Sequence, residues 1–283
     1  MELVLQRRFR ACMFDFDGTL VERGYHMPVP TYIAEILRDV SRLVPMAICT
    51  TRPFRDAIRH AGELFGDTFD EVKSHWTWFC ESGGCGYAYD EASDSYSELY
   101  RVPWPEKQLP RLHFEQLVRE EFDGLVDGLS LHPSVIILRP KDYATMTGNQ
   151  MADICHFLEK KGLALLKEHG LEDTIRLANS SLGVFFFSPE GDKNRGVIEF
   201  GNFLRSKGVA LDEHLRDILL FGDRPMRHGN DEYFLNGLLG TPVSVGEDVP
   251  DRVDLISVID DGGVRLTGPR AVEFLITRVR FMS

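Results

Sequence analysis

Phe14-Asp15-Phe16-Asp17-Gly18-Thr19-Leu20 follows the short apolar run 11–13 and sets two carboxylates, Asp15 and Asp17, before a glycine. A short apolar run is typical of a buried parallel strand. Carboxylates are costly to crowd together, because like charges raise one another's pKa. Their position after a strand therefore indicates a site that binds a cation or acts on an anion. Alone, the segment also fits an ordinary strand-to-loop turn, whereas a calcium loop is disfavoured because Gly18 stands too early and Phe16 is apolar.

Three later segments place polar side chains where an apolar run ends or a helix begins. In chain order they are Ala47-Ile48-Cys49-Thr50-Thr51-Arg52-Pro53, Gly191-Asp192-Lys193-Asn194-Arg195-Gly196 and Leu219-Leu220-Phe221-Gly222-Asp223, the last followed by Asn230-Asp231. Apolar runs that alternate with helical patterns, at 30–43 and 53–64, predict a doubly wound parallel sheet. Ligands of such sheets bind beyond the carboxyl ends of the strands, so we expect Asp15, Thr50 and Asp223 to meet in one pocket.

This ordered set resembles the four motifs of the haloacid dehalogenase-like superfamily, whose members are mostly magnesium-dependent phosphoryl-transfer enzymes. The residues that match, in motif order, are Asp15 with Asp17, Thr50, Lys193, and Asp223 with Asp231. The resemblance implies an α/β fold, with a Rossmann-like doubly wound parallel core and an α+β cap inserted between the second and third motifs. We expect the catalytic core in residues 1–84 and 186–283 and the cap in residues 85–185.

The pattern within the expected cap differs from that of the core. Residues 85–110 are predicted as loop with a possible hairpin strand, and 112–127 and 149–168 as helices. A β-rich run stands at 135–138, and 174–177 with 184–187 predict a hairpin. Hairpins beside helices are typical of an antiparallel α+β unit.

The resemblance also implies a role for each matching residue. Asp15 would be the nucleophile that forms an aspartyl-phosphate, and Asp17 would protonate the leaving group and then activate water. Thr50 would hydrogen-bond a phosphoryl oxygen, and Lys193 would supply positive charge. The residues expected to contact substrate are Thr50, Thr51, Arg52 and Lys193.

A Mg²⁺ ion, which prefers hard oxygen ligands, is the implied cofactor. Its expected ligands are Asp15, the backbone carbonyl of Asp17, Asp223, Asn230 and Asp231. Whether Asn230 and Asp231 bind the metal directly or orient Lys193 stays open. Carboxylates outnumber cations in this set, so without metal the pocket should repel a phosphorylated substrate.

Two details bear on the activity within the superfamily. Residues 224–229 separate Asp223 from Asn230, a long loop that resembles the fourth motif of phosphomannomutases. Thr50-Thr51-Arg52-Pro53 instead resembles the second motif of sugar phosphatases of the sucrose-phosphate phosphatase and Cof-like groups, with Thr51 in place of glycine. We therefore favour a phosphatase that hydrolyses a small phosphorylated metabolite, in particular a sugar phosphate. The alternatives are a phosphosugar mutase and a non-catalytic sugar-phosphate binding protein.

Composition limits the other possibilities. The formal net charge of −12 argues against nucleic acid or an anionic membrane as the main partner. No apolar run has the length of a signal peptide or a membrane span. The five cysteines have no zinc-ligand spacing and are expected to be buried thiols. These features predict a cytoplasmic protein, and both a monomer and a homodimer stay open.

Several other residues invite a functional interpretation, and a structural one is favoured for most. Trp76, Trp78 and Phe79 are expected in the core rather than as a stacking platform. Arg227 and His228 are expected as solvated loop residues. An exposed turn is favoured over a specificity patch for Arg139, Lys141 and Tyr143.

Overall fold

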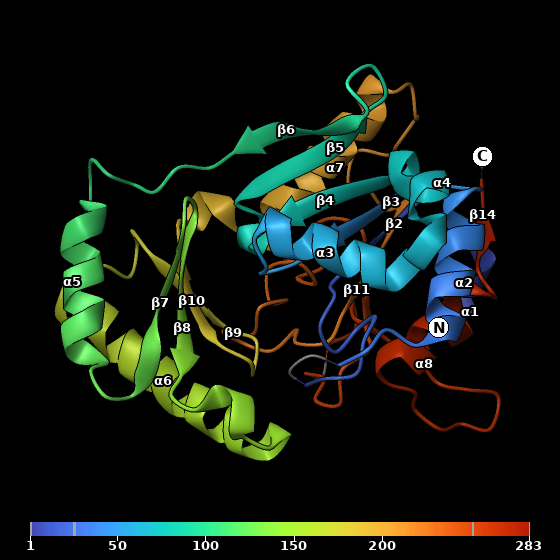
Figure 1. The fold of residues 1–283 in the computed structure, drawn as a ribbon. Coiled ribbons are helices and arrows are strands. Elements are labelled where there is room, and N and C mark those ends of the chain that lie inside the picture. Colours follow the sequence, from blue (N-terminus) through green and yellow to red (C-terminus); the bar gives the residue numbers. More distant parts are fainter. Residues whose placement is uncertain (1, 25–26, 251, 283) are drawn as a thin grey trace.

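The protein is described by a computed structural model covering residues 2–24, 27–250 and 252–282. Within these residues the largest sheet has eight strands in the order β13-β12-β11-β2-β3-β4-β5-β6 (Figure 1). Their bounds are β2 (Ala11–Phe14), β3 (Met46–Cys49), β4 (Trp76–Cys80), β5 (Cys85–Asp90), β6 (Ser95–Arg101), β11 (Ile218–Gly222), β12 (Thr241–Ser244) and β13 (Ile256–Ser257). Strands β13 to β4 pair in parallel, whereas β4, β5 and β6 pair antiparallel.

Helices cover both faces of this sheet. Successive residues of a strand point to opposite faces, so each apolar central strand presents buried side chains to both layers of helices. Helices α2, α3 and α8 pack on the face that includes Phe14 and Ile48, and α7 packs on the face that includes Met13 and Ala47. The helices of this unit are α1 (Glu2–Gln6), α2 (Thr31–Ser41), α3 (Phe54–Phe65), α4 (Phe69–Val72), α7 (Lys193–Ser206) and α8 (Gly268–Ile276). The predicted doubly wound core is confirmed.

A second, smaller sheet has the order β7-β8-β10-β9 and is antiparallel throughout. Its strands are β7 (Val126–His132), β8 (Val135–Pro140), β9 (Arg176–Asn179) and β10 (Val184–Phe187), and its helices are α5 (Arg111–Glu121) and α6 (Gly148–Glu168). The two helices cover one face of the sheet (Figure 1). The other face carries the buried side chains of Val135, Ile137, Ala178, Phe185 and Phe187. We call this unit, residues 104–187, the cap.

The strand pairing differs from the expected division at residues 85 and 185. Strands β5 and β6 form a hairpin that extends the large sheet, so 85–101 does not belong to the cap sheet. The hairpin strand expected in 85–110 is confirmed, whereas a loop over most of that stretch is wrong. The hairpin lies at the sheet edge, where side chains such as Tyr96 and Glu98 stay partly or fully exposed. It therefore lacks the continuous apolar run of the central strands. The helix expected at 112–127 ends at Glu121, and β7 begins at Val126.

The remaining structural expectations concern the core and the thiols. Trp76, Trp78 and Phe79 are buried in β4, as predicted. All five cysteines are buried and free. A short parallel ribbon joins β1 (Arg8–Phe9) to β14 (Arg280–Phe281). In the described part of the chain, no helix combines the length and apolar character that crossing a membrane requires.

Candidate active site

Three of the predicted polar residues follow the ends of three neighbouring strands. Asp15 follows β2, Thr50 follows β3 and Asp223 follows β11, and these strands are neighbours in the sheet. The backbone N–H of Asp15 donates to the carbonyl of Phe221 at 2.7 Å, which extends the β2–β11 ladder to the site. The parallel sheet thus brings together residues far apart in sequence, as predicted.

A glycine makes the close approach of Asp223 possible. Gly18 has a φ of +78°, and a Cβ placed on it would lie 2.2 Å from the Asp223 Oδ2. Any side chain at this position would clash with the carboxylate and strain the backbone. Gly18 therefore turns the chain after Asp17 while leaving room for Asp223.

Lys193 joins two of the predicted carboxylates. Its ammonium donates to the Oδ1 of Asp15 at 2.6 Å and to the Oδ1 of Asp231 at 2.7 Å. The side chain of Lys193 is 1% exposed, and those of Asp15 and Asp231 are 3% and 0% exposed. The N-cap Asp192 begins α7 by accepting from the backbone N–H of Arg195, and this helix start places Lys193 beneath the strand ends.

The fourth-motif carboxylate Asp231 is engaged through both oxygens. Its Oδ2 accepts from the backbone N–H groups of Asp223 at 2.9 Å and Arg224 at 3.0 Å, while its Oδ1 accepts from Lys193. These bonds fold the long loop back onto the end of β11. They also fit the role of a residue that orients Lys193.

The acidic cluster fits a divalent cation. Asp15, Asp223 and Asp231 each offer a ligand atom, and these atoms lie within 4.8 Å of one another. The Oδ2 of Asp15 and the Oδ1 of Asn230 are buried and have no hydrogen-bond partner among the described residues. Buried oxygens without a partner are costly, and a metal ion would satisfy them. The donor set, hard oxygens alone, is the one that Mg²⁺ prefers.

Burial and mutual repulsion shape the titration of the cluster. Burial, followed by the charge of Asp231, raises the pKa of Asp15 well above its ordinary value, although Lys193 lowers it. The same two causes raise the pKa of Asp223 to about 7, with Arg23 opposing them. Burial disfavours the charged form of Lys193, but the carboxylates of Asp15 and Asp231 outweigh it and raise its pKa. Lys193 is therefore a fixed positive charge.

Asp223 has a further partner that the sequence did not reveal. The guanidinium of Arg23 donates to the Asp223 Oδ2 through Nε at 3.1 Å and Nη2 at 2.5 Å. Arg23 stands in the loop after the first motif, and nothing in its sequence context distinguishes it from other surface arginines. Its position shows that a local cation offsets part of the acidic charge.

Arg52 binds the second carboxylate of the first motif. Its Nη2 lies 2.6 Å from the Asp17 Oδ1 and its Nε lies 3.0 Å from the Oδ2, and Nη1 lies 2.8 Å from the His60 Nε2. The backbone N–H of Arg52 also donates to the Thr50 Oγ1 at 3.2 Å. From the sequence, Arg52 is expected to contact substrate, and in the structure its guanidinium lies against Asp17 of the first motif.

A small cavity opens between this pair and the cap. Its volume is about 70 Å³, and its lining includes Asp17, Thr51 and Arg52 from the core and Arg139, Ser180 and Phe185 from the cap. The favoured exposed turn is therefore wrong for Arg139, which lies in β8 and faces the cavity. Lys141 and Tyr143 are not among the residues that line it.

The long loop after Asp223 pairs with the cap. The N–H of Asn179, at the end of β9, donates to the carbonyl of His228 at 2.8 Å, and the N–H of Asn230 donates to the carbonyl of Asn179 at 3.3 Å. The side chain of Arg224 donates to the Ser181 Oγ. The loop that carries two candidate metal ligands thus pairs with the edge of the cap sheet through an isolated parallel bridge between Asn179 and Gly229. No residue pattern in the sequence predicts this contact.

The sequence matches no protein-family profile and no curated protein. Solved structures do resemble it. An IMP-bound, N-terminally truncated IMP-nucleotidase from Plasmodium falciparum has a TM-score of 0.60 at 12% identity, over 98% of this chain and 69% of that one. For a haloacid dehalogenase-like hydrolase from Bacteroides thetaiotaomicron the TM-score is 0.60 at 15% identity, over 96% and 99%.

A third similar structure is the C-terminal domain of the C. albicans trehalose-6-phosphate phosphatase. Its TM-score is 0.62 at 15% identity, over 95% of this chain and 91% of that domain. At these identities the likeness concerns the fold alone. The chain therefore has the fold of the haloacid dehalogenase-like hydrolases, as its motifs predicted.

Proposed function

We propose that the protein is a Mg²⁺-dependent phosphatase that hydrolyses a small phosphorylated metabolite through an aspartyl-phosphate on Asp15. The observation that carries this proposal is the buried Lys193, which holds Asp15 and Asp231 beside Asp223 at the ends of parallel strands. A buried cation shared by carboxylates, with one carboxylate oxygen unpartnered, suits a site that binds metal and transfers an anion. Similar folds named as nucleotidase and phosphatase support the reaction class.

Asp15, Asp223 and Asn230 would hold the metal, with the backbone carbonyl of Asp17, while Asp231 orients Lys193. A bound Mg²⁺ would neutralise the carboxylates and polarise the phosphoryl oxygens. Lys193 would add a second positive charge beside Asp15, and Thr50 would donate its hydroxyl to a phosphoryl oxygen. Together these groups offset the repulsion between the substrate and the acidic cluster.

Two aspartates of the chain would move the phosphoryl group and the proton. A carboxylate oxygen of Asp15 would attack phosphorus, and the bond from phosphorus to the ester oxygen would break. Asp17 would give its proton to the departing oxygen. It would then accept a proton from a water that attacks the aspartyl-phosphate, which releases phosphate and restores Asp15.

The contact between Asp17 and Arg52 sets a condition for these reaction steps. The guanidinium occupies both oxygens of Asp17, whereas a general acid must present one of them to the leaving group. Arg52 would therefore release Asp17 as substrate enters, and its guanidinium would turn to an oxygen of the substrate. Arg52 thus links substrate binding to the release of Asp17.

The cap would select the substrate and close over it. A cavity of about 70 Å³ is small beside ligand pockets of roughly 300–1,000 Å³, so entry requires the cap to move away from the core. Asp56, Arg139 and Ser180 offer charged and polar groups that suit the hydroxyls of a sugar phosphate. Closure would exclude bulk water from the aspartyl-phosphate.

Product analysis tests this proposal against its two alternatives. We would incubate the protein with a panel of sugar phosphates and nucleoside monophosphates, with Mg²⁺ or EDTA, and measure both free phosphate and isomerised sugar phosphate. A phosphatase releases phosphate only with Mg²⁺. An isomerised product would identify a phosphosugar mutase instead. Binding without either product would identify a sugar-phosphate binding protein.

A further inference from the structure

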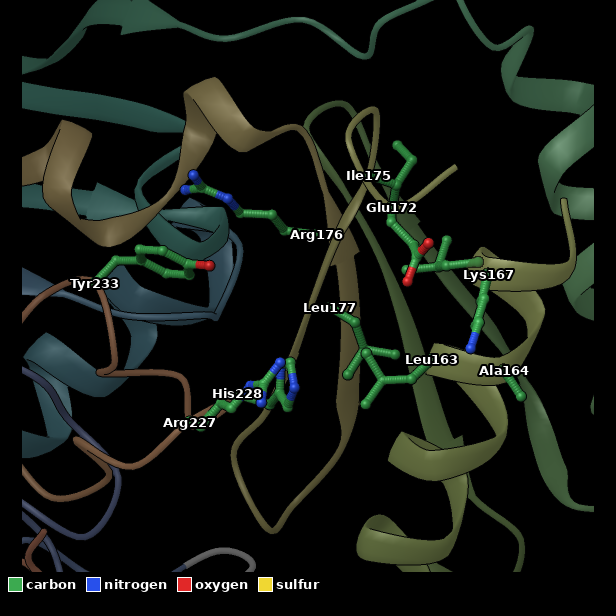
Figure 2. Close-up of a pocket in the computed structure, with 11 residues that line it drawn as sticks. Leu163, Ala164, Lys167, Glu172, Ile175, Arg176, Leu177, Arg227, His228 and Tyr233 are labelled. Carbon is green, nitrogen blue, oxygen red and sulfur yellow. The ribbon is translucent and has the colours of Figure 1, made fainter. Parts of the chain in front are cut away.

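A second cleft lies between the cap and the loop after Asp223. It has a volume of about 440 Å³, within the range of small-molecule sites. Figure 2 shows the loop residues Arg227, His228 and Tyr233 on one side and Leu163 and Lys167 of α6 on the other. None of the predicted catalytic or metal-binding residues lines it.

The charged groups of this cleft favour an anion. Lys167, Arg176 and Arg227 line it, against the single carboxylate of Glu172. Arg176 is paired with Asp192 outside the cleft. For Lys167 and Arg227, no side-chain hydrogen bond or ion pair joins them to another described residue. Unpaired cations gathered at one hollow are unexpected in a chain with a net charge of −12.

The rest of the lining favours an apolar, planar body. Leu163, Ala164 and Leu177 form an aliphatic wall. Opposite it, the guanidinium of Arg176 lies 4.0 Å from the ring centroid of Tyr233 (Figure 2). A sugar would leave hydroxyl groups unpaired against the aliphatic wall, which is costly. A flat ring would contact this wall without leaving hydroxyl groups unpaired. The phosphates attached to it would bind the cations.

The cleft is lined by both segments through which the cap contacts the 224–231 loop. Strand β9 supplies Arg176 and Leu177, and it ends at Asn179, which exchanges backbone hydrogen bonds with His228 and Asn230. A ligand that contacts β9 and Arg227 together would therefore hold these two segments in contact.

We propose that this cleft is a nucleotide-binding site, separate from the carboxylate cluster. The ring would lie on the aliphatic wall of α6 and β9, and the phosphates would bind Arg227, Lys167 and the exposed side of Arg176. Occupation of the cleft would stabilise the pairing of β9 with the 224–231 loop.

Calorimetric titration with ADP, in EDTA so that no metal is bound, tests the site. We expect ADP to bind the wild type more tightly than either pyrophosphate or adenosine, since each lacks one half of the ligand. Arg227→Glu and Lys167→Glu should each weaken ADP binding about tenfold or more, because each converts an attraction into a repulsion. Glu172→Gln should tighten it, because it removes the one opposing charge.

Two controls separate this cleft from other surfaces. Lys160→Glu makes the same charge change on the same helix, outside the lining, and should leave ADP binding unchanged. Asp15→Asn should also leave it unchanged, because Asp15 belongs to the other site. No ADP binding to the wild type, or equal loss in Lys160→Glu and Arg227→Glu, would overturn the proposal, as would binding that requires Asp15.

Amide hydrogen exchange tests the effect on the loop. ADP should slow exchange in peptides that contain Asn179 and Asn230, whose N–H groups make the bonds between β9 and the loop. The same peptides of Arg227→Glu should show no slowing at that ADP concentration. Slowed exchange in the 11–23 and 50–56 peptides instead would place ADP in the catalytic site and contradict the proposal.

Discussion

The guanidinium of Arg52 donates hydrogen bonds to both carboxylate oxygens of Asp17, with Nη2 2.6 Å from Oδ1 and Nε 3.0 Å from Oδ2. A planar fork of this kind fixes the orientation of a carboxylate as well as its charge. In the proposed reaction Asp17 donates a proton and later accepts one. Arg52, which holds Asp17, therefore controls when Asp17 can act.

Replacement of Arg52 should therefore impair turnover without unfolding the protein. We expect Arg52→Gln to lower kcat/KM by about 10–100-fold, and Arg52→Lys to recover only part of it, because a lysine cannot bind two oxygens in one plane. Steady-state kinetics on the preferred substrate would measure this. Arg55→Gln, an exposed position in the first turn of α3 just after Arg52, is the matched control. Equal activity of Arg52→Gln and Arg55→Gln would contradict the assigned role.

Removal of the buried cation should destabilise the fold. Lys193→Met leaves Asp15 and Asp231 buried without their shared partner, which typically costs about 3–5 kcal/mol in the free energy of unfolding. Urea unfolding in EDTA would measure the loss. The double variant Asp15→Asn/Lys193→Met should recover part of it, because one of the two stranded charges is gone. A Lys193→Met protein as stable as the wild type would show that the ammonium does not offset the buried carboxylates.

The stability gained from Mg²⁺ should depend on pH. The pKa of Asp223 is raised to about 7 and that of Asp15 is raised too, so both carboxyls are more basic in the fold than in the unfolded chain. Such groups stabilise the fold below their unfolded pKa, and the contribution is lost as the pH rises through the folded pKa. The metal-free protein should be less stable near pH 8 than near pH 6.

Metal binding needs the ionised carboxylates, so Mg²⁺ should raise the Tm more near pH 8 than near pH 6. Thermal unfolding with EDTA or Mg²⁺ at the two pH values would measure both effects. A Mg²⁺-induced rise in Tm that is equal at the two pH values, or larger at the lower one, would be evidence against a metal held by these carboxyls.

Arg23 should compete with the metal for Asp223. Its guanidinium occupies the Asp223 Oδ2, so Arg23→Gln frees that oxygen and removes a positive charge from the site. We expect this variant to bind Mg²⁺ several-fold more tightly near pH 8.5, above the pKa of about 7 that Asp223 has in the wild type. Calorimetric titration with Mg²⁺ would show it. Weaker Mg²⁺ binding would instead assign Arg23 the role of positioning Asp223 for the metal.

The parallel core was predictable because its signals are local. Apolar runs that end in Asp15, Thr50 and Asp223 specify both the parallel strands and the edge where their side chains meet. Lys193 was predicted as a site residue from the order of the four motifs along the chain. The contacts of Arg23 with Asp223 and of Asn230 with Asn179 join segments that are distant in sequence and carry no distinctive residue pattern.

The cap boundaries were harder to predict for a related reason. The β5–β6 hairpin continues the large sheet, but its edge position leaves polar and aromatic residues in place of an apolar run. The apolar runs of β8 and β10 were visible in the sequence, yet the face that meets the core depends on the docking of the whole cap. Arg139 was therefore expected in an exposed turn, whereas it lines the cavity above Asp17.

The central claim is that Asp15 accepts the phosphoryl group. The most direct test uses Asp17→Asn with p-nitrophenyl phosphate, whose leaving group needs no proton, so that the first step proceeds and hydrolysis of the adduct is slowed. Acid quenching, proteolysis and tandem mass spectrometry would then locate the label. The account predicts a Mg²⁺-dependent phosphoryl group on Asp15 that is absent from Asp15→Asn/Asp17→Asn. A phosphoryl group on another residue, or none while the wild type turns the substrate over, would contradict it.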